Sequence, residues 1–423
     1  MYNSTTLDNG IKILTYKNTY SNSVSVGFWI NAGSIDEKDS ESGFAHFIEH
    51  MMFKGTKKRN AFDIAKEIDK YGAYINAGTT KEYTSYYIKI DHNKIKNALD
   101  ILIDMLSNSL FDKEELEKER RVVLEEIYMY EDSPTDVVHD NLLAAMYPSH
   151  QLGRPILGSI ESVSSFNRKD ILRFLRKHYT TDNLIISIAG KVNHKEVVDY
   201  IKKSNIFNNR RGIKSKKSRK LAKITRQDII KTKDLSQVNF CLGFPAIKKN
   251  DERRYALYVI NTLLGASMSS RLFQELREKS GLCYSIYSFT SLYRDSGILG
   301  IYAGTNLKNF PTAVEKIIYE IKKIKNNDIS DEEIANVKEH LKGNIALSYD
   351  NNDTWMESMA KQSLFYNDYI HFKEIIKKVD RVTRKDVMEL VNLLFPDNYK
   401  IIISSIGNKK HKKILSNLPL IIG

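Results

Sequence analysis

The stretch "GFAHFIEHMMFKGT", residues 43–56, places two histidines and a glutamate inside an otherwise apolar run. His46 and His50 are four residues apart, and Glu49 lies directly before the second histidine. On a helix, residues at i and i+4 share one face, with i+3 close by. If this stretch is helical, both imidazoles therefore point the same way and the carboxylate lies beside them.

Two imidazoles at this spacing can bind one Zn²⁺, each through a nitrogen about 2 Å from the metal. A catalytic zinc site needs a third protein ligand and leaves one position open. The predicted helix "EKERRVVLEEIYMYEDSP" offers Glu126, together with Glu119 seven residues earlier on the same face. One of this pair can bind the metal while the other orients an imidazole or a water. Glu125 faces elsewhere, and we expect it to be solvated.

Glu49 could accept a proton from a water whose pKa the metal lowers to about 7. The alternative is that each histidine simply packs on an apolar face and that the glutamate-rich helix is a solvated surface. Two histidines and a glutamate within "FAHFIEHMMF" favour the metal site, because buried carboxylates need partners.

The two halves of the chain repeat one plan with an offset of about 210 residues, as in duplicated folds. Each half opens with an apolar alternation ("VSVGFWINAGS" and "VNFCLGFPAI") and continues through a helical segment into a glycine-led, tyrosine-rich strand pair. Strands and helices mix without regular alternation, so we expect an α+β fold with two homologous domains, each a largely antiparallel sheet packed with helices. The predicted division is 1–209, a basic linker at 210–224, and 225–423.

In the second half we take "SSRLFQELREKSG" as the helix that corresponds to the histidine-bearing one, and it has no histidine. We therefore expect a metal site in the first half and one zinc ion per chain.

The net charge of +13 is concentrated in one segment. Residues 201–235 contain thirteen Lys or Arg and two Asp, a net charge of +11, so the rest of the chain carries 13 − 11 = +2. The segment is poor in aromatic side chains, whereas nucleic-acid binders usually combine a basic groove with stacking aromatics. This favours a solvated linker over a nucleic-acid or anionic-membrane surface.

Composition indicates an ordinary globular protein, with 423 residues, 42% hydrophobic and 28% charged. Two cysteines are too few for a disulfide framework, so we expect a reducing compartment, the cytoplasm. The first residues read as strands rather than as a targeting peptide, and no apolar run is long enough to span a bilayer.

The chain resembles the M16 metallopeptidases, in particular the mitochondrial processing peptidase β-subunits and their bacterial homologues. The His-x-x-Glu-His order is typical of the inverzincins. The resemblance covers essentially the whole chain. It rests on five segments, the first of which contains this motif: "GFAHFIEHMMFKGTKKR", "GAYINAGTTKEYTSYY", "EKERRVVLEEI", "QLGRPILGSIESV" and "SSRLFQELREKSGLCYSIYS".

The resemblance implies that the zinc ligands are His46, His50 and Glu126. It makes Glu49 the general base and Glu119 the supporting carboxylate. Asn76 and Ala77 would belong to an edge strand that pairs with the substrate backbone, as extended peptides add to open sheet edges. Without the resemblance, the sequence around Asn76 predicts an ordinary turn residue.

In the second half, Arg277 and Tyr284 match an Arg/Tyr pair that many family members bring to the zinc site, where they could stabilise an oxyanion or hold substrate. Arg277 could instead pair with Glu275 or Glu278, and Tyr284 could be a core residue.

Asp136 and Asp140 stand at the offsets where processing peptidases recognise an arginine near the cleaved bond. Four residues apart, they share a helix face, as a paired guanidinium requires. Asp136 replaces a more typical glutamate, which shortens its reach. Gly72-Ala73 replaces a common Gly-Gly.

By its length the chain has half the domains of the long single-chain members, so we expect a second subunit, either a copy of the chain or a catalytically silent relative. Because both the zinc and the Arg277/Tyr284 motifs are present, that subunit is expected to be a copy of the chain. The resemblance also allows a second class of function, a non-catalytic structural or assembly subunit, although such chains typically lose the His-x-x-Glu-His set.

Overall fold

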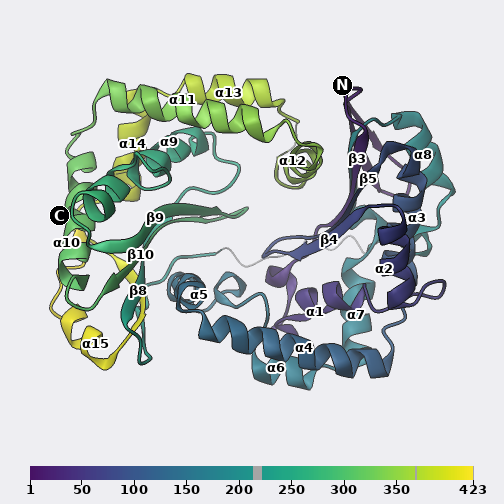
Figure 1. The fold of residues 1–423 in the computed structure, drawn as a ribbon, viewed down its shortest axis with the longest axis horizontal. Helices are drawn as coiled ribbons and strands as arrows, with labels where there is room; N and C mark the ends of the chain where they lie inside the picture. Colours follow the sequence, from purple (N-terminus) through teal and green to yellow (C-terminus); the bar gives the residue numbers. More distant parts are fainter. Residues whose placement is uncertain (213–221, 367–368, 423) are drawn as a thin grey trace. The chain divides into compact units, whose positions relative to one another are not determined.

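The computed structural model describes residues 1–212, 222–366 and 369–422, which form two compact units (Figure 1). The first unit comprises residues 1–128, 154–219 and 348–369, and the second comprises 129–153, 220–347 and 370–423. The units are thus not contiguous along the chain. The predicted boundaries 1–209, 210–224 and 225–423 describe the duplication of the sequence and stay a prediction. Residues 213–221 of the predicted linker lie outside the described residues.

The first unit contains a six-stranded sheet in the order β1-β2-β6-β3-β5-β4. β2 and β6 are parallel, and the other neighbouring strands are antiparallel. The strands are β1 (Tyr2–Thr6), β2 (Lys12–Lys17), β3 (Ser23–Ile30), β4 (Tyr74–Thr79), β5 (Thr84–Asp91) and β6 (Leu184–Gly190). β4 therefore forms one edge of this sheet.

The second unit contains a five-stranded sheet in the order β7-β12-β8-β10-β9. β7 and β12 are parallel, and the other neighbouring strands are antiparallel. The strands are β7 (Ile229–Thr232), β8 (Gln237–Ala246), β9 (Cys283–Leu292), β10 (Gly297–Asn306) and β12 (Ile402–Gly407), beside a small pair of β11 (Tyr399–Lys400) and β13 (Ile421–Ile422).

The two sheets have one topology. Taking β2, β6, β3, β5 and β4 as counterparts of β7, β12, β8, β10 and β9 reproduces the strand order and the parallel or antiparallel sense of every pair. β1 is an addition at the far edge of the first sheet. This confirms the predicted α+β fold with two homologous, largely antiparallel domains.

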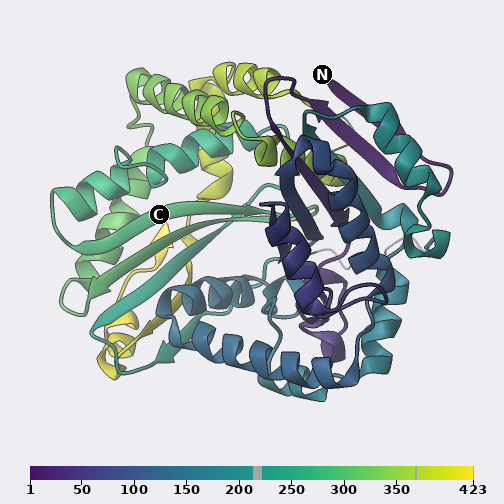
Figure 2. The same cartoon turned by 45° about the vertical axis from the view of Figure 1, so that its right-hand side comes forward.

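Helices cover both faces of the first sheet (Figure 2). The main core lies on one face, between the strands and α1, α3, α4, α7 and α8. The opposite face is covered by α12, which contacts β6 and β3 and accepts a hydrogen bond at Met356 O from Ser187 at 2.7 Å. Because both faces are covered, β3 is buried along nearly its whole length. The helices are α1 (Phe44–Met51), α2 (Ala61–Lys70), α3 (Ile95–Asn108), α4 (Lys113–Asp132), α6 (Ile160–Ser165), α7 (Arg168–His178), α8 (His194–Lys203) and α12 (Asn352–Phe365).

The second sheet is covered in the same way. Its main core includes α9, α10, α13 and α14, whereas α5, which comes from the first half of the sequence, packs on β8 and β12. Leu142 and Met146 of α5 lie close to Gly243 of β8, where a larger residue would collide with them. The helices are α5 (Pro134–Met146), α9 (Arg254–Leu264), the π-helical η7 (Phe273–Glu278), α10 (Phe310–Lys325), α11 (Asp331–Ser348), α13 (Phe372–Asp380), α14 (Arg384–Leu394) and α15 (Lys409–Leu415).

Among the described residues, no helix is both long and apolar enough to cross a membrane.

Candidate metal centre

The helix α1 is held at its N-terminus by the buried carboxyl group of Glu37. Gly43 precedes it with φ 97°, a left-handed conformation that glycine adopts without strain. Glu37, only 2% exposed, accepts hydrogen bonds from the backbone N–H groups of Gly43 (2.9 Å) and Ala45 (2.8 Å). Burial raises the pKa of Glu37 to about 8, against the effect of these two hydrogen bonds. The first turn of α1 carries His46. It is therefore fixed by the left-handed Gly43 before it and by the two backbone hydrogen bonds to Glu37.

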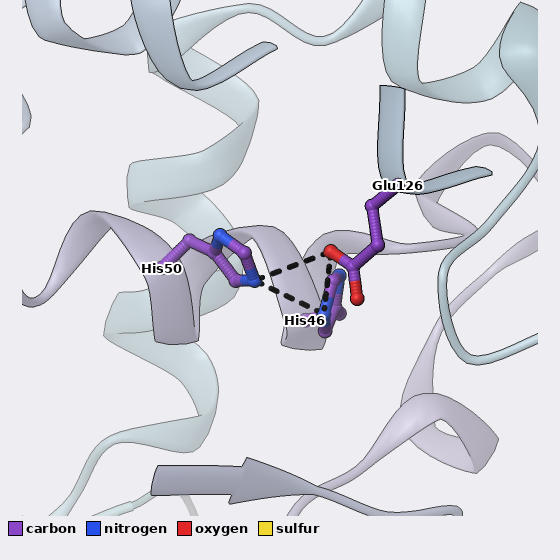
Figure 3. A group of neighbouring side chains, drawn as sticks. All are labelled: His46, His50 and Glu126. Atoms are coloured by element: carbon purple, nitrogen blue, oxygen red, sulfur yellow. Dashed lines mark hydrogen bonds and ion pairs between the residues drawn. The ribbon is translucent and has the colours of Figure 1, made fainter. Parts of the chain in front are cut away.

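The side chains of His46, His50 and Glu126 converge (Figure 3). The two Nε2 atoms are 3.2 Å apart, and Glu126 Oε2 lies 3.7 Å from His46 Nε2 and 3.6 Å from His50 Nε2. A tetrahedral zinc ion about 2.0–2.1 Å from each donor requires donor–donor distances of about 3.3 Å. The observed triangle comes close to this requirement, so the three residues fit a zinc ion.

The neutral state of His46 and the tautomer of His50 suit metal binding. Burial, followed by the nearby His50, lowers the pKa of His46 to about 3, so its ring is neutral. The ring of His50 is partly buried, which lowers its pKa, but the hydrogen bond and charge of Glu119 and the charge of Glu126 raise it overall. Because an ionised carboxylate only accepts, His50 Nδ1–H donates to Glu119 Oε1 at 2.8 Å. In the neutral ring the lone pair of His50 then lies on Nε2, which faces the cluster.

Glu119 is the carboxylate that orients the ring of His50. It is 3% exposed, and its second oxygen, Oε2, lies 2.6 Å from the ammonium group of Lys54. Burial raises the pKa of Glu119, but the hydrogen bonds from His50 and Lys54 outweigh it and lower the pKa overall. The contacts thus distinguish the two glutamates of α4: Glu119 lies at Nδ1 of His50 and Glu126 at Nε2. Glu125 is exposed, as expected.

Glu49 lies outside this triangle and lines the neighbouring cleft. Thr79 Oγ1 donates a hydrogen bond of 2.5 Å to Glu49 Oε2. Burial raises the pKa of Glu49, partly offset by the Thr79 hydrogen bond. The raised pKa brings the carboxyl closer to the range in which a general base works near neutral pH.

The cleft has a volume of about 290 Å³. α1 and α4 contribute Glu49, His50 and Glu119, and Phe53 and Lys54 follow α1. The edge strand β4 contributes Ile75, Asn76 and Ala77. Asn76 is therefore a strand residue rather than a turn residue. The structure brings the predicted substrate strand and the predicted metal helix together within one unit.

The remaining predicted residues lie in the second unit. Arg277, on η7, has its Nε 3.8 Å from Glu278 and its guanidinium 4.8 Å from the ring centre of Phe273, whereas Glu275 pairs with Lys279. Tyr284 is 79% exposed, so it is not a core residue.

Asp136 and Asp140 lie one turn apart on α5, in the second unit with Arg277 and Tyr284. Asp136 is exposed and Asp140 is partly buried. Burial raises the pKa of Tyr130, and the charges of Asp140 and Asp136 raise it further. Both carboxylates therefore act on the same side chain, in agreement with a shared helix face.

The element order corrects one detail of the sequence comparison. Two helices, α1 and α2, separate β3 from β4, and two helical segments, α9 and η7, separate their counterparts β8 and β9. The counterpart of α1 is therefore α9, "RYALYVINTLL", whereas "SSRLFQELREKSG" corresponds to α2. α9 also lacks histidine, so the expectation of a metal site in the first half does not depend on this error.

Two partners of the site were not predicted from the sequence, Thr79 and Lys54. Lys54 stands four residues after His50, which gives a weak helical-spacing signal. Thr79 contacts Glu49 because β4 lies beside α1, and nothing in the local pattern indicates this contact.

Comparison with known proteins agrees with this fold and identifies the family. The family model described as "Insulinase (Peptidase family M16)" matches residues 12–160, and "Peptidase M16 inactive domain" matches residues 165–341. The chain is 40% identical to the uncharacterized zinc protease YmxG of Bacillus subtilis, over 95% of this chain and 98% of that protein. It is 35% identical to an uncharacterized zinc protease of Rickettsia felis, over 93% and 95%.

Solved structures show the same fold. A protease from Helicobacter pylori superimposes with a TM-score of 0.88 at 22% identity, covering 96% of this chain and 99% of the other. A structure described as a peptidase M16 inactive domain from Pseudomonas fluorescens gives a TM-score of 0.85 at 18% identity, covering 97% and 98%. The fold and the donor set define a metallopeptidase class. The chain belongs to peptidase family M16, and the two relatives described above are named zinc proteases.

Proposed function

We propose that the chain is a zinc-dependent endopeptidase that cleaves extended or presequence-like peptides close to basic residues, as processing peptidases do. The observation that supports this proposal most strongly is the triangle of donors from His46, His50 and Glu126. The triangle lies next to a cleft that contains Glu49 and an open sheet edge. The second candidate, a non-catalytic structural or assembly subunit, is disfavoured because the ligands, the base and the supporting carboxylate are all present.

One zinc ion per chain would be held by the two histidines and Glu126. In such a site zinc supplies Lewis acidity, which polarises a carbonyl and acidifies water. Glu49 accepts the proton of the attacking water and returns it to the leaving amine. Glu119, tied to Lys54, fixes the orientation and tautomer of His50. Arg277 and Tyr284 of the second unit stabilise the oxyanion or hold the substrate.

The substrate backbone binds as an added strand along β4. At the β4–β5 turn, Thr80 N–H donates to Tyr83 O at 2.8 Å, and bonded and non-bonded pairs alternate in an antiparallel ladder. By this alternation the backbone groups of Ile75 and Ala77 face the open edge. Ala77 N–H indeed donates to the side chain of its neighbour Asn76 (2.8 Å) instead of to β5. A bound peptide carbonyl would replace that side chain.

Selection for arginine is assigned to Asp136 and Asp140. Two carboxylates one turn apart repel each other, and a cation between them relieves this repulsion. A charge-assisted pair of this kind contributes about 1.5–3 kcal/mol, roughly ten- to a hundred-fold in specificity.

Digestion of a peptide library with and without a zinc chelator tests the function. We expect cleavage only without chelator, with arginine enriched close to the cleaved bond. In Asp136→Asn with Asp140→Asn, kcat/KM should fall about ten-fold or more for arginine peptides and little for matched alanine peptides. Cleavage that persists in chelator would contradict a zinc peptidase. Equal losses on both peptides would contradict the arginine pocket alone.

We further propose that the active form is a cytoplasmic homodimer, since the zinc and Arg/Tyr motifs occur on the same chain. Light scattering on the purified, active protein should give a mass of 2 × 48.8 = 97.6 kDa. An active species of 48.8 kDa would contradict the dimer.

A further inference from the structure

A second cavity, of about 500 Å³, lies in the first unit, and its lining shares no residue with the metal-site cleft. Three of its residues stand where strands end. Lys17 is the last residue of β2, His92 directly follows β5, and Lys191 directly follows β6. The rest of the lining comes from Thr19 and from the first two turns of α3 and α8 with the segments that lead into them.

The register places these strand ends at one edge of the sheet. In the parallel pair β2–β6, Lys17 is opposite Gly190, and in the antiparallel pair β3–β5, Ser23 is opposite Asp91. The cavity lies at this edge, beside the carboxyl ends of β2, β5 and β6. Its volume is within the range of about 300–1,000 Å³ that is usual for small-molecule sites.

The lining is positively charged and its lysines are not neutralised. Within the described parts of the chain, Lys17, Lys96 and Lys191 form no ion pair within 4.0 Å. Glu196 is the carboxylate of the lining, and it accepts a hydrogen bond from Asn193 Nδ2 at 2.9 Å. With His92 neutral, the net charge is 3 − 1 = +2.

Two helix N-termini add to this potential. α3 has 14 residues and α8 has 10, and the first turn of each lines the cavity. Each N-terminus carries a partial positive charge of about +0.5. The lining also contains apolar and aromatic residues, namely Ile95, Leu99, Val192, Val197 and Tyr200.

From this juxtaposition we propose that the cavity binds a soluble phosphate monoester with an apolar or ring-shaped body. A phosphate monoester carries about −1.5 to −2 charges near neutral pH, which matches the net charge of the lining. The phosphate lies among Lys17, Lys96 and Lys191, and the body lies against Leu99, Val197 and Tyr200. This site is independent of the peptidase function.

Calorimetry with the full-length protein and AMP tests the proposal, with adenosine, which lacks the phosphate, as the paired ligand. We expect AMP to bind and adenosine to bind at least ten-fold more weakly. Lys96→Glu and Lys191→Glu should each weaken AMP binding about ten-fold. The matched control is Lys195→Glu, since Lys195 is exposed on the first turn of α8 but does not line the cavity. The affinity of Lys195→Glu for AMP should change less than three-fold.

Hydrogen exchange locates the ligand without relying on the variants. AMP should increase protection of residues 92–99 and 191–200 and leave the metal helix, 44–51, unchanged. Equal binding of AMP and adenosine, equal losses in the control and cavity variants, or no binding at millimolar AMP would each overturn the proposal. Binding to phosphatidic acid vesicles without binding to AMP would overturn the soluble ligand in favour of a lipid headgroup.

Discussion

Replacing Glu49 by glutamine is expected to leave the fold and the zinc content unchanged and to reduce turnover by about 10²–10⁴-fold. The amide has the size of the carboxylate and keeps an oxygen that can accept the hydrogen bond from Thr79. It cannot accept a proton from water. The loss should therefore appear in kcat, measured on a peptide that the native chain cleaves, while bound zinc measured by elemental analysis stays at the native level.

Glu125→Gln provides a matched control, because it removes the same charge from an exposed position on α4 close in sequence to the proposed ligand Glu126. Its turnover should stay within about two-fold of the native rate, as for most surface substitutions. A near-native rate in Glu49→Gln would show that another group acts as the base. Loss of zinc in the same variant would instead assign Glu49 a role in holding the metal.

Helical spacing alone was sufficient to predict that His46 and His50 share one face of a helix. It could not decide which glutamate of α4 completes the cluster, because Glu119 and Glu126 are seven residues apart on the same side. The structure separates them through the two nitrogens of one ring: Glu119 bonds Nδ1 of His50, and Glu126 approaches Nε2. That distinction depends on how α4 crosses α1, which is a tertiary property.

For the fold, too, the sequence patterns predicted the elements but not how they pack against one another. The repeated strand and helix patterns predicted two homologous domains, and the common strand order confirms them. The patterns did not indicate that α12 of the second half packs on the first sheet, or that α5 of the first half packs on the second. An amphipathic helix specifies that it has an apolar face, not which sheet covers that face. Likewise, Thr79 reaches Glu49 only because the edge strand lies beside α1.

His50→Ala and Glu126→Ala are each expected to abolish stoichiometric zinc binding. Either change removes one of three donors that lie 3.2–3.7 Å apart, and two remaining donors hold zinc far more weakly than three. Elemental analysis after dialysis should show less than about one-tenth of a zinc ion per chain, against one in the native protein, if affinity falls by several powers of ten.

Glu119→Gln separates a ligand from its support. The amide can still accept the hydrogen bond from His50 Nδ1. It no longer carries the negative charge that makes the imidazole a stronger metal ligand. Loss of such a partner typically weakens metal affinity about 10–100-fold, so this variant should keep zinc at saturating concentration and lose it on dialysis.

A stability measurement shows whether the metal is lost from a folded protein. Zinc that binds only the native state stabilises it by RT ln(1 + [Zn]/Kd), so a chelator should lower the melting temperature of the native chain. The same chelator should leave the melting temperatures of His50→Ala and Glu126→Ala unchanged, because these variants have no zinc to lose. If both variants retain one zinc per chain and still respond to the chelator, the metal is bound elsewhere and the triangle of donors on α1 and α4 is not its site.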